Sequence, residues 1–197
     1  SVNRSNFVPV ALTPKSFTEK NLKLCSNRYL LRPNLIGKII NHVSPKRNET
    51  ILVLPASTGY SSAIISNLAE TVIAIEEDDN LISIAEKGMS KSGINNVVII
   101  KKKINENCLD QGPFNAIIIE GAIDYLPEQF LDQLENQGRL FALIKNDNVA
   151  NATLYIKNVN SVNSRFLFSC DVPKLNFFRK KNSFSFWYDP VINIYIK

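Results

Sequence analysis

The feature that most constrains the fold is a strand, turn, helix and strand pattern over residues 51–76. The apolar run at residues 51–54 is short and continuous, as is typical of a parallel strand buried on both faces. A turn containing Gly59 leads into a helical segment at residues 61–69, and a second apolar run ends at Glu76. This layout is that of the first half of a nucleotide-binding βαβ unit, in which a carboxylate after the second strand binds a ribose.

The same alternation continues along the chain and predicts a mostly parallel sheet. Helices are expected where apolar residues recur at helical spacing, at residues 33–43, 61–69, 79–92 and 128–134. Strands are expected at the apolar runs 51–54, 72–75, 97–100, 116–119 and 140–144. Right-handed crossovers bring the carboxyl ends of such strands to one edge of the sheet, where ligands bind. Glu120 follows one of these strands directly.

After residue 150 the pattern changes to strands without helices. Residues 152–157 and 165–170 are strand-like runs joined by an Asn- and Ser-rich turn, which predicts an antiparallel hairpin. A parallel α/β sheet closed by an antiparallel pair is the organisation of the Rossmann-like class I methyltransferases. We expect one domain over residues 1–186. The aromatic extension 187–197 alternates as a strand does, and it is expected to pack on its own sheet or to pair with a second copy in a homodimer.

Composition argues against several other classes of protein. The chain has 23 Lys and Arg against 18 Asp and Glu, and its densest basic runs, 101–103 and 179–181, lack any nucleic-acid-binding motif. Cys25, Cys108 and Cys170 are too widely spaced for a zinc site or a redox pair, so we expect no metal and interpret them as buried thiols of a cytoplasmic protein. No apolar run approaches the roughly 18 residues of a membrane span.

Seven segments, in this order and spacing, resemble the protein-L-isoaspartate O-methyltransferase family, and in particular its alphaproteobacterial branch. They are FVP at 7–9, RYLLRP at 28–33, GYSSA at 59–63, AIEED at 74–78, PFNAIIIEGA at 113–122, LDQLENQGRL at 131–140 and FLFSCDVPKL at 166–175. The resemblance implies an enzyme that transfers a methyl group from S-adenosylmethionine to the free carboxyl of isoaspartyl residues in damaged proteins or peptides. It also implies a helical segment ahead of FVP in a longer natural protein.

The resemblance further assigns roles to individual residues near the cofactor. Gly59 would keep the turn open beside the cofactor, Tyr60 would begin the helix, and Glu76 would accept hydrogen bonds from the ribose hydroxyls. Ser57 lies in the same loop, and Lys103 aligns with an acid that many relatives direct at the adenine.

The expected residues on the acceptor side are Tyr29, Arg32 and Glu120, with Glu120 facing the transfer site. No general base is expected, because the sulfonium and the carboxylate are already reactive and their alignment supplies most of the rate.

The chain also departs from the family pattern. Pro55 and Ser57 replace the first two glycines of the loop; proline fixes φ, and a left-handed Ser57 would cost roughly 1 kcal/mol or more relative to glycine. Leu31 stands where most of the family has a hydroxyl group. Two hypotheses therefore remain: a weak or altered methyltransferase, and an inactive methyltransferase fold retained for binding. Gly59 and Glu76 can also be interpreted as purely structural: Gly59 as part of a tight turn, and Glu76 as a solvated residue at a helix start.

Overall fold

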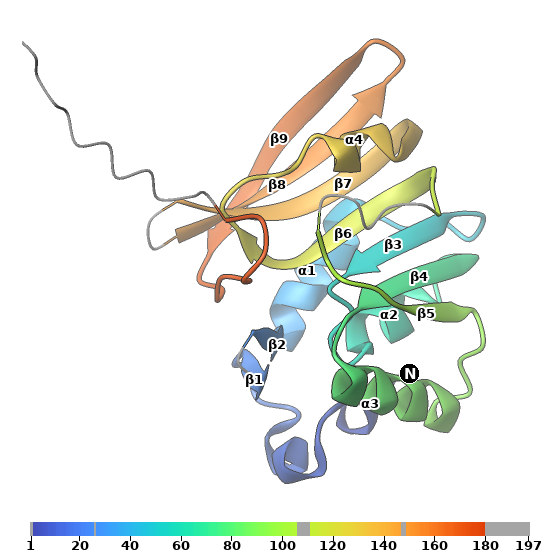
Figure 1. The fold of residues 1–197 in the computed structure, drawn as a ribbon, viewed down its shortest axis with the longest axis vertical. Helices are drawn as coiled ribbons and strands as arrows, with labels where there is room; N and C mark the ends of the chain where they lie inside the picture. Colours follow the sequence, from blue (N-terminus) through green and yellow to red (C-terminus); the bar gives the residue numbers. More distant parts are fainter. Residues whose placement is uncertain (1, 26, 106–110, 147–148, 180–197) are drawn as a thin grey trace, which may run out of the picture.

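Seven strands form the central sheet within the part of the chain that the computed structural model describes, in the order β5-β4-β3-β6-β7-β8-β9 (Figure 1). The described residues are 2–25, 27–105, 111–146 and 149–179. Cys108 and the extension 187–197 lie outside them.

The strands confirm the predicted fold class. Their bounds are β3 Thr50–Leu54, β4 Thr71–Glu76, β5 Val97–Lys101, β6 Phe114–Ile123, β7 Leu134–Asn146, β8 Val149–Asn158 and β9 Ser161–Cys170. Pairs among β3 to β7 are parallel, whereas β7 with β8 and β8 with β9 are antiparallel. The sheet is therefore a parallel α/β sheet closed by the predicted hairpin, and its ligand edge is formed by the carboxyl ends of β3, β4, β5 and β6.

The helices are α1 Pro33–Val43, α2 Tyr60–Ile65, α3 Asp79–Lys91 and α4 Gln129–Asp132. Helix α1 has the predicted bounds, since proline suits its first turn and Ser44 ends it in a left-handed conformation. Helices α1 and α2 pack on one face of the sheet, and α4 packs on the other with Leu175 and Phe178. Figure 1 shows α4 on the opposite side of the sheet from α1.

An N-terminal layer lies beside this sheet and was not expected from the sequence. It consists of the 3₁₀ turns η1 Arg4–Phe7 and η2 Val10–Lys15 and a small antiparallel pair, β1 Leu22–Cys25 and β2 Arg28–Leu30. Turn η1 packs closely on α3, since a Cβ added at Gly88 would lie 2.6 Å from the Phe7 ring. Glycine at this position therefore permits the contact that places Arg4.

The structure corrects the expected position of Glu120, which lies inside β6 and not just after a strand. The strand continues because residues 173–178 run beside it: the Leu175 N–H donates to the Ala122 carbonyl over 2.8 Å, and the Asp124 N–H donates to the Phe178 carbonyl over 3.1 Å. Such long-range pairing cannot be seen in local periodicity. Pairing with β8 likewise makes β7 longer than residues 140–144. Helices α2 and α4 are shorter than expected.

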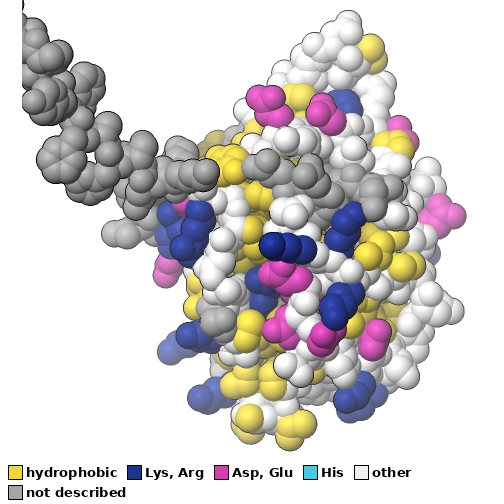
Figure 2. All heavy atoms as spheres, viewed as in Figure 1, with side chains coloured by type: hydrophobic (Ala, Val, Ile, Leu, Met, Phe, Trp, Pro, Cys, Tyr) yellow, Lys and Arg dark blue, Asp and Glu magenta, His cyan; other side chains and the backbone are white. Residues whose placement is uncertain are grey.

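None of the described helices is long and apolar enough to cross a membrane. On the face shown in Figure 2, acidic and basic side chains are interspersed.

Candidate functional site

Two buried acids flank the carboxyl end of β3. Strand β3 pairs with β4 on one side and β6 on the other, with Val53 opposite Ala74 and Leu54 opposite Ile119. Glu76 ends β4, Glu120 lies one residue past Ile119, and both side chains are buried. The sheet topology thus brings together two carboxyl groups that are 44 positions apart in the sequence.

The loop between β3 and α2 lies at the same edge and has a left-handed backbone at two positions. Ser57 has φ 50° and Gly59 has φ 81°. Gly59 is the N-cap of α2, and an added Cβ there would lie 3.0 Å from both Ala85 Cβ and Met89 Cε. Ser57 therefore adopts the unfavourable left-handed conformation that was anticipated from the missing glycine. Glycine suits position 59 for two reasons, because φ is positive and because a side chain would crowd α3.

Backbone N–H groups hold the Glu76 carboxylate at the end of β4. Oε2 accepts a hydrogen bond from the Ser57 N–H at 2.9 Å, and Oε1 accepts from the Glu77 and Asp78 N–H groups at 2.9 and 3.2 Å. The Glu76 side chain is 0% exposed. It is therefore not the solvated helix start that its acidic neighbours permit; Asp78 caps α3 instead.

Arg28 forms an ion pair with this carboxylate. Its Nε lies 3.1 Å from both oxygens of Glu76, and its Nη2 lies 3.0 Å from Oε1. Nη2 also donates to Glu77 at 3.0 Å, and the guanidinium carbon lies 5.4 Å from the centre of the Phe177 ring. Burial by itself lowers the pKa of Arg28, but the hydrogen bonds and charge of Glu76 outweigh it and raise that pKa.

Glu120 is held differently, by a single hydroxyl. Ser61 Oγ donates to Glu120 Oε2 in a short hydrogen bond. Burial raises the pKa of Glu120 to about 7; the Ser61 hydrogen bond and the charge of Arg4 oppose this rise, and the charge of Glu76 adds to it. This carboxyl group therefore changes its charge near neutral pH.

Arg4 is a buried cation with unused donors. Its Nη2 donates to the Leu31 carbonyl over 2.7 Å, and its guanidinium carbon lies 4.9 Å from the centre of the Tyr60 ring. Its side chain is 1% exposed, and burial lowers its pKa. Within the described residues, Arg4 Nε and Nη1 have no hydrogen-bond partner, and neither do the hydroxyls of Ser57, Thr58 and Ser62. Such groups usually find partners, so this cluster is an unusual feature of the edge.

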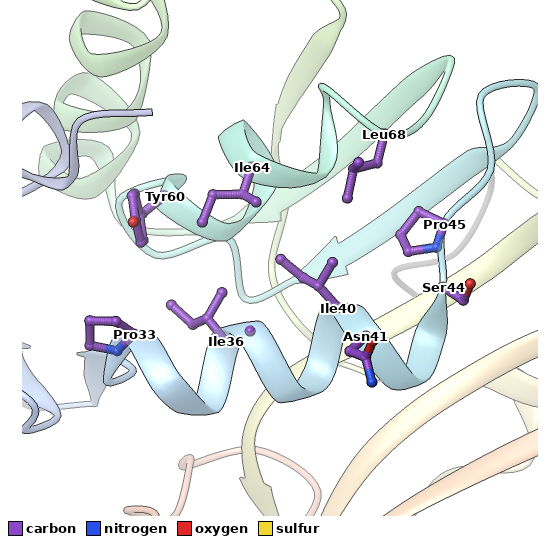
Figure 3. A pocket seen from close by; sticks show the side chains of 10 residues that line it. Pro33, Ile36, Ile40, Asn41, Ser44, Pro45, Tyr60, Ile64 and Leu68 are labelled. Carbon is purple, nitrogen blue, oxygen red and sulfur yellow. The ribbon is translucent and has the colours of Figure 1, made fainter. Parts of the chain in front are cut away.

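Two concave regions differ in their position and lining. One cavity of about 410 Å³ is lined by side chains that follow β5 and β6 and by the segment past β9: Ile104, Asn105, Tyr125, Asn176, Phe177, Phe178 and Arg179. The other, of about 450 Å³, lies between α1 and α2 and is lined largely by aliphatic groups such as Ile36, Ile40 and Ile64 (Figure 3). The first adjoins Arg28 through Phe177 and is the better candidate for a planar ligand.

One family model matches most of the chain. The model of the protein-L-isoaspartate(D-aspartate) O-methyltransferase family matches residues 1–170. This chain belongs to that family.

The relatives of this isoaspartate methyltransferase family member are distant in sequence. A protein-L-isoaspartate O-methyltransferase of Methanospirillum hungatei is 26% identical over 158 residues, which are 80% of this chain and 73% of the relative. One from Syntrophobacter fumaroxidans is 28% identical over 139 residues, which are 71% of this chain and 65% of the relative.

Two solved structures have a fold similar to that of this chain. A protein-L-isoaspartate O-methyltransferase superposes with TM-score 0.74 at 19% identity, covering 88% of this chain and 58% of the other. A proposed Plasmodium falciparum enzyme of the same name, in complex with S-adenosyl-L-homocysteine, superposes with TM-score 0.71 at 19% identity, covering 88% and 86%. This chain thus spans under two thirds of one of these structures. At such identities the likeness concerns the fold.

The structure brings together some of the residues that the family resemblance singled out. Ser57, Gly59, Tyr60, Glu76 and Glu120 all lie at the carboxyl edge around the β3–α2 loop. Their roles in this family member remain predictions.

The other three singled-out residues lie apart from the two acids. Strand alternation directs Tyr29 away from the face of Arg28. Arg32 precedes α1 and its backbone N–H donates to Asn21, while Lys103 is exposed after β5. None of the three forms a hydrogen bond or ion pair with Glu76 or Glu120 among the described residues.

Arg4 and Arg28 were missed by sequence reasoning. Each is a lone arginine in a short segment that has no long periodic pattern, so neither segment was assigned an element. A usable signal was the alternation of Arg28, Tyr29 and Leu30, which puts the arginine on the same side as a buried leucine.

Proposed function

We propose that this protein is an S-adenosylmethionine-dependent carboxyl O-methyltransferase that acts on isoaspartyl residues of peptides or proteins. Membership of the family supports this proposal. The observation that carries it is Glu76, a fully buried carboxylate at the end of β4, oriented by the backbone N–H groups of Ser57, Glu77 and Asp78. A ribose-binding carboxylate of a nucleotide fold occupies this position relative to the first strand.

The residues of the edge match the three parts of the cofactor. Glu76 would accept hydrogen bonds from the ribose hydroxyls, and the aromatic cavity beside Phe177 would hold the adenine. Arg4 would bind the methionine carboxylate through Nε or Nη1, which are its unused donors among the described residues. A charge-assisted hydrogen bond of this kind suits a carboxylate. The chain therefore fits the cofactor, on the condition that Arg28 leaves Glu76.

When bound, S-adenosylmethionine supplies a methyl group that is already activated by a sulfonium. The task of the protein is to orient the acceptor and to exclude water. Glu120 lies inside β6 next to the loop, and with a pKa of about 7 it is partly protonated at neutral pH. We assign it to positioning at the transfer site, where its protonated form would donate a hydrogen bond to an acceptor carboxylate without repelling it.

Further features of the proposal concern partners and location. We propose isoaspartyl-containing polypeptides as the partners, no nucleic acid or membrane partner, and a cytoplasmic location, which the free thiols of Cys25 and Cys170 support. A homodimer through residues 187–197 stays a prediction outside the described residues.

A second candidate function is an inactive methyltransferase fold retained for binding. One observation favours it: the carboxylate that would bind the ribose is already paired with Arg28.

One experiment separates the two candidates. Binding of S-adenosylhomocysteine is measured by titration calorimetry, and methyl transfer is measured with an isoaspartyl peptide and a matched aspartyl peptide. The proposal expects binding, and a base-labile methyl ester on the isoaspartyl peptide alone. Binding without transfer to either peptide would support the retained fold, and no binding would contradict the cofactor assignment.

A further inference from the structure

Both oxygens of Glu76 are already saturated by protein donors. Oε1 accepts from Arg28 Nε and Nη2 and from two backbone N–H groups, and Oε2 accepts from Arg28 Nε and from the Ser57 N–H. A carboxylate offers about four lone-pair sites. The backbone donors belong to the strand end and its loop, so the guanidinium is the group that another ligand would have to replace.

A ribose would need the sites that Arg28 now occupies. Two adjacent hydroxyls on one carboxylate make a fork with the same two oxygens that receive the guanidinium. The two ligands are therefore mutually exclusive at Glu76. Removing the guanidinium without replacement would leave a buried carboxylate unpaired, which is costly, whereas exchange for two hydroxyl donors retains hydrogen bonds.

The element that carries Arg28 is not paired with the central sheet. Strand β2 pairs only with β1 among the described strands, and the two form a separate small sheet. Arg28 also has a second partner, since its Nη2 lies 3.0 Å from Glu77 Oε1, and the Glu77 side chain is 41% exposed. Glu77 offers a position at which the guanidinium stays paired after it leaves Glu76.

We propose that Arg28 is an internal competitor of the cofactor ribose, and that binding of an adenosine-containing ligand displaces Arg28 from Glu76 toward Glu77 and solvent. This inference rests on the proposed function. The measured dissociation constant is then the intrinsic constant divided by the fraction of molecules in which Arg28 is displaced. Arg28 thereby sets the affinity of the site.

The test compares Arg28→Gln with the wild type in calorimetric titrations with S-adenosylhomocysteine, adenosine and 2′,3′-dideoxyadenosine. We expect at least tenfold tighter binding of the first two ligands to Arg28→Gln, because no guanidinium competes. The dideoxy analogue, which lacks both hydroxyls, should gain much less. The matched control is Arg139→Gln, which removes a similar Arg–Glu pair at the opposite edge of the sheet and should leave all affinities unchanged.

Arg28→Lys covers the case in which Arg28→Gln does not fold. Lysine retains the positive charge but cannot form the fork, so we expect a smaller gain of about three- to tenfold. A readout independent of affinity is trypsin cleavage after Arg28 in the wild type, detected by mass spectrometry, which should rise when S-adenosylhomocysteine is added.

The outcomes separate this inference from the proposed function. If the wild type and the Arg28 variants bind S-adenosylhomocysteine equally well, Arg28 does not compete, and the inference is overturned while the proposed function stands. Weaker binding by the variants would make Arg28 a supporting residue and would also overturn the inference. If no folded form binds any of the three ligands, both proposals are wrong.

Discussion

The chain places an Arg–Glu pair at each edge of its sheet, and the two pairs differ in their surroundings. At the amino edge, Arg139 Nη1 and Nη2 contact the two oxygens of Glu49 at 2.9 and 2.7 Å, and Nε and Nη2 donate to the carbonyls of Val43 and Ser44 at 2.8 and 3.3 Å. Every nitrogen of that guanidinium is used. The carboxyl edge holds Arg28 and Glu76, and also Arg4 beside Tyr60, with two nitrogens that have no partner among the described residues.

This difference indicates that Arg139–Glu49 is a structural ion pair and that Arg28–Glu76 belongs to a candidate functional site. The amino-edge pair joins the end of α1 and the start of β3 to Arg139 inside β7, and the hydrogen-bond partners of the pair all come from the chain itself. The carboxyl edge retains buried donors and hydroxyls without protein partners in the described residues, together with a carboxyl group of raised pKa. Perturbed and unsatisfied groups are typical of functional sites. An Arg–Glu pair alone therefore does not indicate a functional site, whereas buried polar groups that lack partners around such a pair do.

The largest effect is expected from Glu76→Ala. The substitution removes the buried partner of Arg28, which keeps only the partly exposed Glu77, and it leaves three backbone N–H groups without their acceptor; the free energy of unfolding should fall by about 3 to 5 kcal/mol. It should also abolish measurable binding of S-adenosylhomocysteine. Urea unfolding and calorimetry check the two effects, with Glu49→Ala as the control that loses stability and keeps binding. Retained affinity in Glu76→Ala would place the ribose elsewhere.

A change in pH should affect the free energy of unfolding in opposite directions through Glu120 at the carboxyl edge and Glu49 at the amino edge. Glu120 has a pKa of about 7 in the folded chain against an ordinary 4.5. The folded state thus binds an extra proton between these values, and the free energy of unfolding falls by about 3 kcal/mol as pH rises through that window. Hydrogen bonds from Arg139 outweigh burial and lower the pKa of Glu49, so its contribution is lost as pH falls below its ordinary range.

Urea unfolding from about pH 2.5 to 8 covers both windows and measures this dependence in the wild type and in Glu120→Gln. The substitution should remove the fall between pH 4.5 and 7 and leave the acid-side loss due to Glu49. An unchanged profile in Glu120→Gln would show that Glu120 is ionised throughout this range.

Arg139→Gln should have a smaller effect, confined to stability. It breaks charge-assisted hydrogen bonds to a buried Glu49 and should lower the free energy of unfolding by about 2 kcal/mol. Affinity for S-adenosylhomocysteine should stay the same, because the pair lies at the far edge of the sheet. A loss of affinity comparable to that of Glu76→Ala would remove the distinction between the edges.

The smallest effect concerns two serines with the same strained backbone. Ser44 at the amino edge and Ser57 at the carboxyl edge both have φ 50°. Ser44→Gly should stabilise the chain by up to about 1 kcal/mol. Ser57→Gly should match or exceed this, since it also removes a buried hydroxyl that lacks a partner among the described residues. Thermal unfolding measures both; a destabilised Ser57→Gly would show that the hydroxyl has a structural partner.

Much of the fold follows from local patterns in the sequence. The bounds of α1 were predicted from its proline and its apolar spacing, and the core strands β3 and β4 were predicted to within one residue at each end. Glu76 was expected at the end of a strand and lies there. The β8–β9 hairpin was predicted because two strand-like runs flank a short polar turn. In each case the signal lies within one continuous stretch of the sequence.

The sequence by itself determined the order of the elements and the carboxylate at the end of β4, because periodicity and turn chemistry act over short distances. Only the tertiary structure decided what meets that carboxylate. Arg28 is 48 positions from Glu76, and Arg4 is 27 positions from the Leu31 carbonyl that it contacts. The extension of β6 past Glu120 likewise required residues 173–178 beside it. Long-range pairing depends on the packed sheet, so the contents of the site were decided by the fold.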